Sequence, residues 1–312
     1  MDNPNPNNPT LNRLQESSKD PKGFIYSTYS AVRGETQTYT PFLPLTNEGD
    51  ASVSYAVGGS VSTVSFEDSK IGNRQPGTRR RRGGGIRGKV RGFSRGSRRN
   101  LLRRLAAINR KAFRAFEGKV FFLTLTYPHE WPEDPDVSKR HLKAFLKRLE
   151  RNYGRFAAFW RLGIQARGAW HYHVLLFTPR SLGSIRDLRS FVASSWYEVC
   201  GKISEGHLRA GTNVEVVRKW RTVTSRAERY LAKEEEFPAG LATGRIWAVW
   251  NEELLPVRWE AVQVSFRDAY RIGRVFRKLA RIRSTGPLCR LTVFVRYENV
   301  VRLLEYLGYR LE

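Results

Sequence analysis

Two histidines, His171 and His173, stand two residues apart in a segment whose other residues are typical of a β-strand. Residues i and i+2 of a strand project from the same face, so the two imidazoles would lie side by side. Neutral imidazoles are common ligands of divalent metals, and the pair is therefore a candidate metal site. The spacing alone leaves open a second interpretation, in which both histidines pack in the sheet and bind nothing.

Tyr230 and Lys233 form a second candidate pair, in a segment that predicts a helix ending before Pro238. Ser225 and Glu228 have the spacing of a capping box, which favours a helix start at Ser225. Side chains three apart on a helix share one face. A tyrosine oxygen can attack a phosphodiester, and a nearby ammonium stabilises the charge that develops. A half-buried tyrosine beside a surface lysine is the alternative.

The segments that must position these residues predict an α+β fold, with a central antiparallel sheet and flanking helices. A tight turn at residues 167–170 joins two strands into an antiparallel hairpin. A helix is expected to begin at Ser138 and to end at Gly154. The other elements expected are strands at 120–127, 157–166, 171–177 and 213–219, and helices from Ser97 onward and at 184–199.

The composition points to a polyanionic partner. The 312 residues include 55 Lys and Arg against 29 Asp and Glu, which gives a formal net charge of +26, and such an excess favours binding to nucleic acid through its phosphates. The 40% of hydrophobic residues excludes a wholly disordered chain. Two cysteines without a CxxC motif exclude a disulfide framework and a zinc ribbon. The sequence has no signal peptide pattern and no apolar run of about 18 residues, so we expect a cytoplasmic protein without membrane contact.

The charge is unevenly distributed, which predicts four regions. Residues 1–78 are expected to be largely disordered or weakly structured, 79–99 form an Arg/Gly-rich basic segment, 100–256 form the core, and 257–312 form a basic helical accessory segment. Residues 79–99 are interpreted as a basic N-terminal arm that binds phosphates, with a solvated linker as the alternative. The expected contacts in this arm are Arg79, Arg80, Arg81, Arg82, Arg87, Lys89 and Arg91.

Three motifs occur in a fixed order: FLTLTYP at 122–128, then RG followed by HYH, then YLAK. Over residues 87–256 this pattern resembles the HUH endonucleases, the rolling-circle replication initiators of bacterial plasmids and small single-stranded-DNA phages. The resemblance implies that His171 and His173 bind Mg²⁺ or Mn²⁺. It also implies that Tyr230 is the nucleophile, accompanied by Lys233.

The sequence departs from this family at one position. Relatives carry a glutamate, as a third metal ligand, on the strand before the histidine pair, and Gly163 stands in that place. Gln165 faces the same side and is the candidate ligand, because an amide oxygen can bind a hard cation more weakly than a carboxylate. An interpretation in which Gln165 only makes hydrogen bonds within the sheet remains open. Glu130 and Glu133 are more remote candidates.

The resemblance implies nicking of single-stranded DNA at an origin hairpin through a 5′-phosphotyrosine, in a bacterial host that supplies polymerase and helicase. Arg167 and Trp170, at the turn before His171, are the expected DNA contacts of the core, whereas His207 is expected at the surface. One alternative is a non-catalytic single-stranded-DNA-binding relative. Others are an HUH relaxase or transposase, with the same chemistry on another substrate, and a zinc hydrolase that uses the histidine pair.

Overall fold

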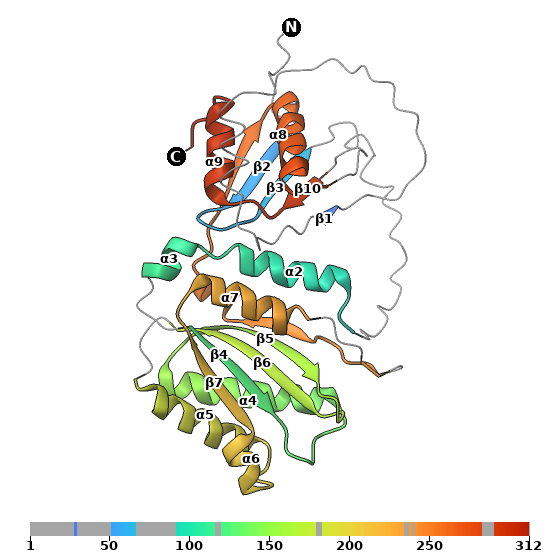
Figure 1. Ribbon diagram of the computed structural model, residues 1–312, viewed down its shortest axis with the longest axis vertical. Coiled ribbons are helices and arrows are strands. Elements are labelled where there is room, and N and C mark those ends of the chain that lie inside the picture. The colour runs from blue at the N-terminus through green and yellow to red at the C-terminus, as the bar shows by residue number, and fades with distance from the viewer. Residues whose placement is uncertain are drawn as a thin grey trace, which may run out of the picture. The chain divides into compact units, whose positions relative to one another are not determined.

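A computed structural model describes residues 28–29, 51–66, 92–115, 120–178, 183–233, 237–238, 241–282 and 290–311. The chain divides into two compact units (Figure 1). The larger unit comprises Gly84–Leu105 and Arg110–Pro256, and the smaller comprises Met1–Gly83, Ala106–Asn109 and Val257–Glu312. Within the described residues, each unit has helices and an antiparallel five-stranded sheet, which confirms the α+β prediction.

The sheet of the larger unit contains the strands that the sequence predicts, and every neighbouring pair is antiparallel. A turn at Gln165–Ala169 joins β5 to β6, where the Gln165 amide nitrogen donates to the Ala169 carbonyl over 2.8 Å. The order across the sheet is β7 (Thr212–Val217), β4 (Val120–Thr126), β6 (Trp170–Phe177), β5 (Ala157–Ile164) and β8 (Trp247–Trp250).

One face of this sheet is covered by α4 (Pro135–Tyr153) and α5 (Ile185–Val199), as Figure 1 shows. Alternate residues of β6, such as Tyr172, pack in the core that these helices complete. The prediction that α4 begins at Ser138 is wrong, because the Asp134 carboxylate caps the helix and Pro135 fits its first turn. Ser138 is instead fully buried, and its hydroxyl lies 2.8 Å from that of Tyr172.

The other face of the sheet carries α7 (Trp220–Arg226), which continues as a π-helical segment, η1 (Ala227–Leu231). The predicted start at Ser225 is therefore also wrong. Val223, Ala227 and Leu231 recur every four residues and are all buried, so burial of this apolar face determines where the helix lies. The remaining elements of this unit are α2 (Arg95–Ala106), whose last residue belongs to the smaller unit, α3 (Arg110–Ala115), α6 (Glu205–Ala210) and the 3₁₀ turn η2 (Glu252–Leu254).

The smaller unit joins distant parts of the chain. Its strands lie in the order β1 (Thr28–Tyr29), β10 (Arg290–Val293), β3 (Ser62–Phe66), β2 (Ala51–Ala56) and β9 (Trp259–Val264). Helices α8 (Phe266–Leu279) and α9 (Tyr297–Tyr306) lie on the same side of this sheet (Figure 1). Val64, Phe276 and Leu304 are fully buried members of the core between them. No helix within the described ranges has the length and apolar character needed to cross a bilayer.

Candidate active site

His171 and His173 lie on β6 with both rings on the sheet face opposite to α4 and α5. Their ring centroids are 4.8 Å apart and the rings are nearly perpendicular, at 82°. Both side chains are buried, each with only 8% of its surface exposed. The Nδ1 atom of His173 lies 3.3 Å from the Thr124 hydroxyl on β4, whereas Nδ1 of His171 has no hydrogen-bond partner among the described residues.

The surroundings of the two imidazoles favour their neutral forms. Burial lowers the pKa of His171 to about 4, with further contributions from the positive charges of Arg161 and Lys233. Burial also lowers the pKa of His173 to about 3, followed by the effects of His171, Arg161 and Lys233. Both rings are therefore neutral near pH 7, with nitrogen lone pairs free to bind a metal.

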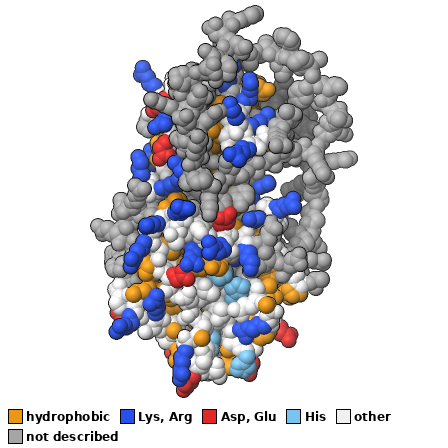
Figure 2. All heavy atoms as spheres, in the orientation of Figure 1, with side chains coloured by type: hydrophobic (Ala, Val, Ile, Leu, Met, Phe, Trp, Pro, Cys, Tyr) orange, Lys and Arg blue, Asp and Glu red, His pale blue; other side chains and the backbone are white. Residues whose placement is uncertain are grey.

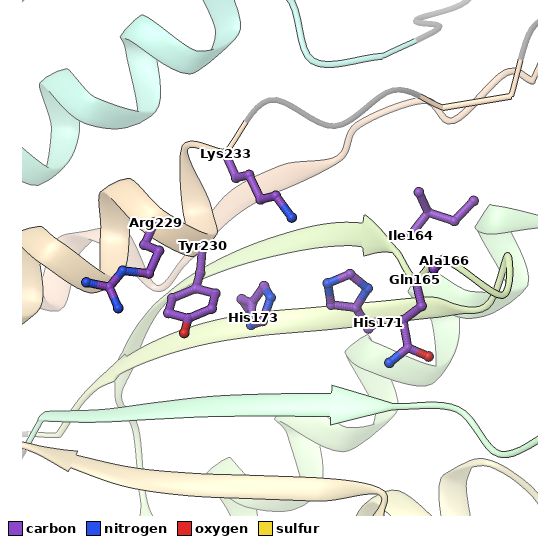
Figure 3. Close-up of a pocket in the computed structure, with 8 residues that line it drawn as sticks. All are labelled: Ile164, Gln165, Ala166, His171, His173, Arg229, Tyr230 and Lys233. Carbon is purple, nitrogen blue, oxygen red and sulfur yellow. The ribbon is translucent and has the colours of Figure 1, made fainter.

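Tyr230 is placed over the histidines by η1. Its ring centroid lies 5.0 Å from that of His173 and 5.2 Å from that of Phe122 on β4. The Ala232 amide donates to the Ala227 carbonyl five residues earlier, over 2.7 Å, and Lys233 follows directly. Figure 3 shows Tyr230 and Lys233 extending from this segment toward the imidazole pair. A pocket of about 400 Å³ is lined by Ile164, Gln165, Ala166, His171, His173, Arg229, Tyr230 and Lys233.

An ion pair on the same sheet face holds the nucleophile candidate. Arg226, one turn before Tyr230, donates Nη1 to the tyrosine hydroxyl over 3.3 Å and Nη2 to the Glu215 carboxylate on β7. Its guanidinium also lies 5.7 Å from the Phe122 ring centroid. An arginine fixed by a carboxylate and an aromatic ring can direct its remaining donor at one oxygen. Glu215 thus orients Arg226, and Arg226 contacts the tyrosine oxygen.

A buried cation adds to the positive field. Arg161 lies directly across from His173 in the β5–β6 ladder, with 1% of its surface exposed. Its guanidinium lies 4.2 Å from the Phe93 ring centroid and donates to the Leu162 and Lys233 carbonyls. Among the described residues no carboxylate lines the pocket, whereas Arg229 and Lys233 do. Figure 2 shows the same excess of Lys and Arg over Asp and Glu across the visible face. The site is therefore suited to an anion.

The metal-ligand predictions can be compared with this geometry. Gly163 is the cross-strand neighbour of His171, so the position that carries a glutamate in the family lies beside the imidazoles and has no side chain. Gln165 does line the pocket, at its end beside His171 (Figure 3), but its Oε1 accepts a hydrogen bond of 2.9 Å from Arg167 Nε. Within the described residues, no cluster of three or more His, Cys, Asp and Glu could hold a metal.

The donors that remain are two neutral imidazoles and one amide oxygen. They fit a divalent ion that accepts nitrogen ligands, such as Mn²⁺, better than Mg²⁺, which prefers carboxylate and water oxygens. Glu130 does not line the pocket, and its side chain is exposed beside His129, whose Nε2 lies 3.3 Å from its carboxylate. Glu133 is likewise not among the lining residues.

The other predicted contacts lie apart from the pocket. Arg167 donates to the Pro128 and Tyr127 carbonyls and so fixes the loop after β4. Trp170 is 3% exposed, and its indole nitrogen donates to the Pro132 carbonyl over 2.8 Å. A ring so deeply buried offers no face to a base, so Trp170 is not carried further as a stacking residue. The predicted contacts Arg79, Arg80, Arg81, Arg82, Arg87, Lys89 and Arg91 lie outside the described residues.

The surface prediction for His207 is wrong. Its side chain is 6% exposed, and Nε2 lies 2.8 Å from the Thr126 carbonyl at the end of β4. The sequence analysis also missed Arg226, Glu215 and Arg161 as parts of the site. Arg226 could have been found from its i, i+4 spacing to Tyr230, whereas the Glu215 contact depends on the pairing of β7 with β4.

The sequence of this part of the chain was compared with known families. Residues 120–235 match the family model of the replication-associated protein ORF2. The match covers a little over a third of the chain, from β4 to just beyond Lys233, and includes every described residue that lines the pocket. The pocket is therefore carried by a segment similar to replication-associated proteins of the ORF2 family. No curated protein matches the sequence.

Proposed function

We propose that the protein initiates DNA replication by nicking single-stranded DNA at an origin and keeping the new 5′ end covalently bound to Tyr230. One observation carries the proposal: a tyrosine hydroxyl, an imidazole pair and the Lys233 ammonium converge on one pocket whose described lining contains cations and no carboxylate. A phosphodiester is the substrate whose charge fits this pocket. The similarity of the same segment to replication-associated proteins supports an origin as the source of the DNA.

In the proposed reaction, the Tyr230 oxygen attacks the scissile phosphorus in line with the leaving group. A bond forms between this oxygen and phosphorus, and the bond from phosphorus to the 3′ oxygen breaks. The phenolic proton passes to water, and the departing 3′ oxygen takes up a proton from water. Lys233, which lines the same pocket, stabilises the negative charge that develops on the phosphoryl oxygens.

Arg226 and Glu215 prepare the nucleophile in this proposal. The Arg226 guanidinium donates to the Tyr230 hydroxyl, so it holds the oxygen in place and stabilises the phenolate that must form before attack. Glu215 keeps the guanidinium from turning toward the phosphate of the substrate. The ion pair is only partly exposed, since the side chains of Arg226 and Glu215 retain 26% and 34% of their surface, so solvent screens it less than a surface pair.

His171, His173 and, more weakly, Gln165 would hold the divalent cation, Mn²⁺ or Mg²⁺, that the family resemblance implies. Such an ion supplies Lewis-acid polarisation of the scissile phosphate. The low pKa of each imidazole keeps both nitrogen ligands unprotonated down to mildly acidic pH. The 5′-phosphotyrosine keeps the energy of the broken bond, so a later attack by a 3′ hydroxyl rejoins the strand without a nucleotide cofactor. Host polymerase would extend the free 3′ end, and a host helicase would open the duplex.

The test is formation of a covalent adduct between the protein and DNA. The protein is mixed with a pool of hairpin-forming single strands and Mn²⁺, and denaturing electrophoresis detects DNA attached to the chain. Wild-type protein and the control Tyr306→Phe, which alters an exposed tyrosine of α9, should form the adduct. Tyr230→Phe should not. Sequencing of the attached DNA would then identify the nick site.

A binding-only role is the second candidate, favoured by one observation. Gly163 leaves the position beside His171 without the carboxylate that a hard cation prefers. In that case wild-type protein would bind single strands and form no adduct with any pool that covers the native origin. Added Mn²⁺ would then leave the affinity for DNA unchanged.

A further inference from the structure

Helix α8 in the smaller unit carries a row of cations on its outer surface. Arg267, Arg271, Arg274 and Lys278 are all exposed and recur at intervals of four, three and four residues. At 3.6 residues per turn, these positions fall within roughly 60° of the helix circumference and extend over about 16 Å. We call these four residues the cationic stripe.

The opposite side of α8 accounts for its packing, so the cationic stripe has no role in the core. Ala269, Ile272 and Phe276 are buried against the sheet. The one acidic residue of the helix is Asp268, whose carboxylate accepts hydrogen bonds of 2.8 Å from the Ser265 and Tyr309 hydroxyls. Asp268 therefore leaves most of the positive charge of the stripe uncompensated.

The only contact between the cationic stripe and an acidic group, within the described residues, is weak. Arg271 Nη1 lies 3.4 Å from the Asp268 carboxylate, and the arginine side chain keeps 49% of its surface exposed. An exposed pair of this kind contributes little to stability. Four like charges on one helix face repel one another, and this cost is recovered only when an anion binds. A linear polyanion matches the linear arrangement of the cations.

The shape of the surface favours duplex DNA over a single strand. A single strand is bound in a groove lined by aromatic platforms. The outer side of α8 is convex, and its exposed aromatic residues, Phe266 and Tyr270, border the cationic stripe only toward its N-terminal end. An α-helix fits the major groove of duplex DNA, where cations along the helix reach the phosphates of the bordering strand.

We propose that α8 is a second DNA-binding surface, on which the cationic stripe contacts the phosphate backbone of duplex DNA. The choice of DNA as the ligand rests on the proposed function, whereas the stripe itself lies in a different unit from the nicking pocket. Duplex flanking an origin, or the stem of its hairpin, would then be held by the smaller unit. The larger unit would act on the single strand.

The test compares two double variants of the full chain, both in the Tyr230→Phe background and without divalent cation, so that no DNA is cleaved. Arg274→Gln/Lys278→Gln removes two charges from the cationic stripe. Arg302→Gln/Arg310→Gln removes two exposed charges from elsewhere in the same unit and is the matched control. Fluorescence anisotropy measures binding to a labelled duplex of about 20 base pairs, and to a single strand of the same length, over a series of salt concentrations.

The stripe variant should bind the duplex roughly thirtyfold more weakly at about 0.15 M salt, and its salt slope should be smaller by about two. The control variant should change the duplex affinity only a few-fold, and both should melt at the wild-type temperature. Equal losses in the two variants, no loss in the stripe variant, or a loss confined to the single strand would each overturn the proposal. Adduct formation by the same stripe substitutions with Tyr230 intact reports separately on the nicking pocket and should persist.

Discussion

The buried histidine pair predicts a steep dependence of stability on pH. The folded-state pKa is about 4 for His171 and about 3 for His173, against 6.5 for an unperturbed histidine. Between these values the unfolded chain takes up protons that the folded chain excludes. The stabilisation that results is therefore fully present above pH 6.5 and is lost as the pH falls toward 4. Acidification without metal should destabilise the larger unit.

The magnitude follows from the same values. Between pH 7 and pH 5, each histidine should cost the folded state about 2 kcal/mol, and the pair about 4 kcal/mol. At a urea dependence of about 2 kcal/mol per molar, the unfolding midpoint should fall by about 2 M. Both side chains are only 8% exposed, so solvent does little to screen the charges that lower these pKa values.

The assay is urea unfolding in EDTA at both pH values, followed by tryptophan fluorescence. All tryptophans except Trp259 lie in the larger unit, so the signal reports on the unit that contains the histidines. His171→Gln/His173→Gln provides the comparison, because other groups also titrate in this range. The wild-type protein should lose about 4 kcal/mol more than this variant between pH 7 and pH 5. The same loss in both proteins would refute the reasoning.

Three further predictions concern the pocket. Gly163→Glu places a carboxylate beside His171 and should raise the affinity for Mg²⁺ at least tenfold, measured by calorimetry with Mn²⁺ as the comparison; unchanged Mg²⁺ binding would contradict the predicted ligand geometry. Arg226→Gln removes the donor to the Tyr230 hydroxyl and should slow single-turnover adduct formation roughly 10²-fold with little change in DNA affinity, whereas Glu215→Gln should have a smaller effect in the same assay. EDTA should abolish the adduct and leave most DNA binding intact in an anisotropy titration, and cleavage that survives EDTA would exclude a required metal.

Local patterns were sufficient to predict the sheet that carries the site. Alternation of side chains identified the strands on either side of the Gln165–Ala169 turn, and the placement of His171 and His173 on one face followed from it. Helix starts were less predictable. Ser138 and Ser225 both had capping signatures, but burial of apolar residues fixed where each helix lies.

Contacts between distant segments were not predictable from local patterns. The pairing of β2 and β3 with β9 and β10 joins residues about 200 positions apart, and weak strand signals near the N-terminus gave no indication of it. The contact between Glu215 and Arg226 requires both the register of β7 and the position of η1. His207 was expected at the surface because a lone histidine in a polar segment gives no sign of the Thr126 carbonyl that it contacts.

The missing carboxylate and the excess of cations in the pocket are connected. Arg161, Arg229 and Lys233 create a positive field around the imidazoles, and this field opposes a divalent cation as long as no anion is present. A glutamate at position 163 would offset part of the field in the free protein. With Gly163 in its place, the phosphodiester of the substrate is the group that neutralises the pocket, and its oxygens are ligands that such a cation accepts. Metal binding should then be linked to DNA binding, and by reciprocity each ligand raises the affinity for the other.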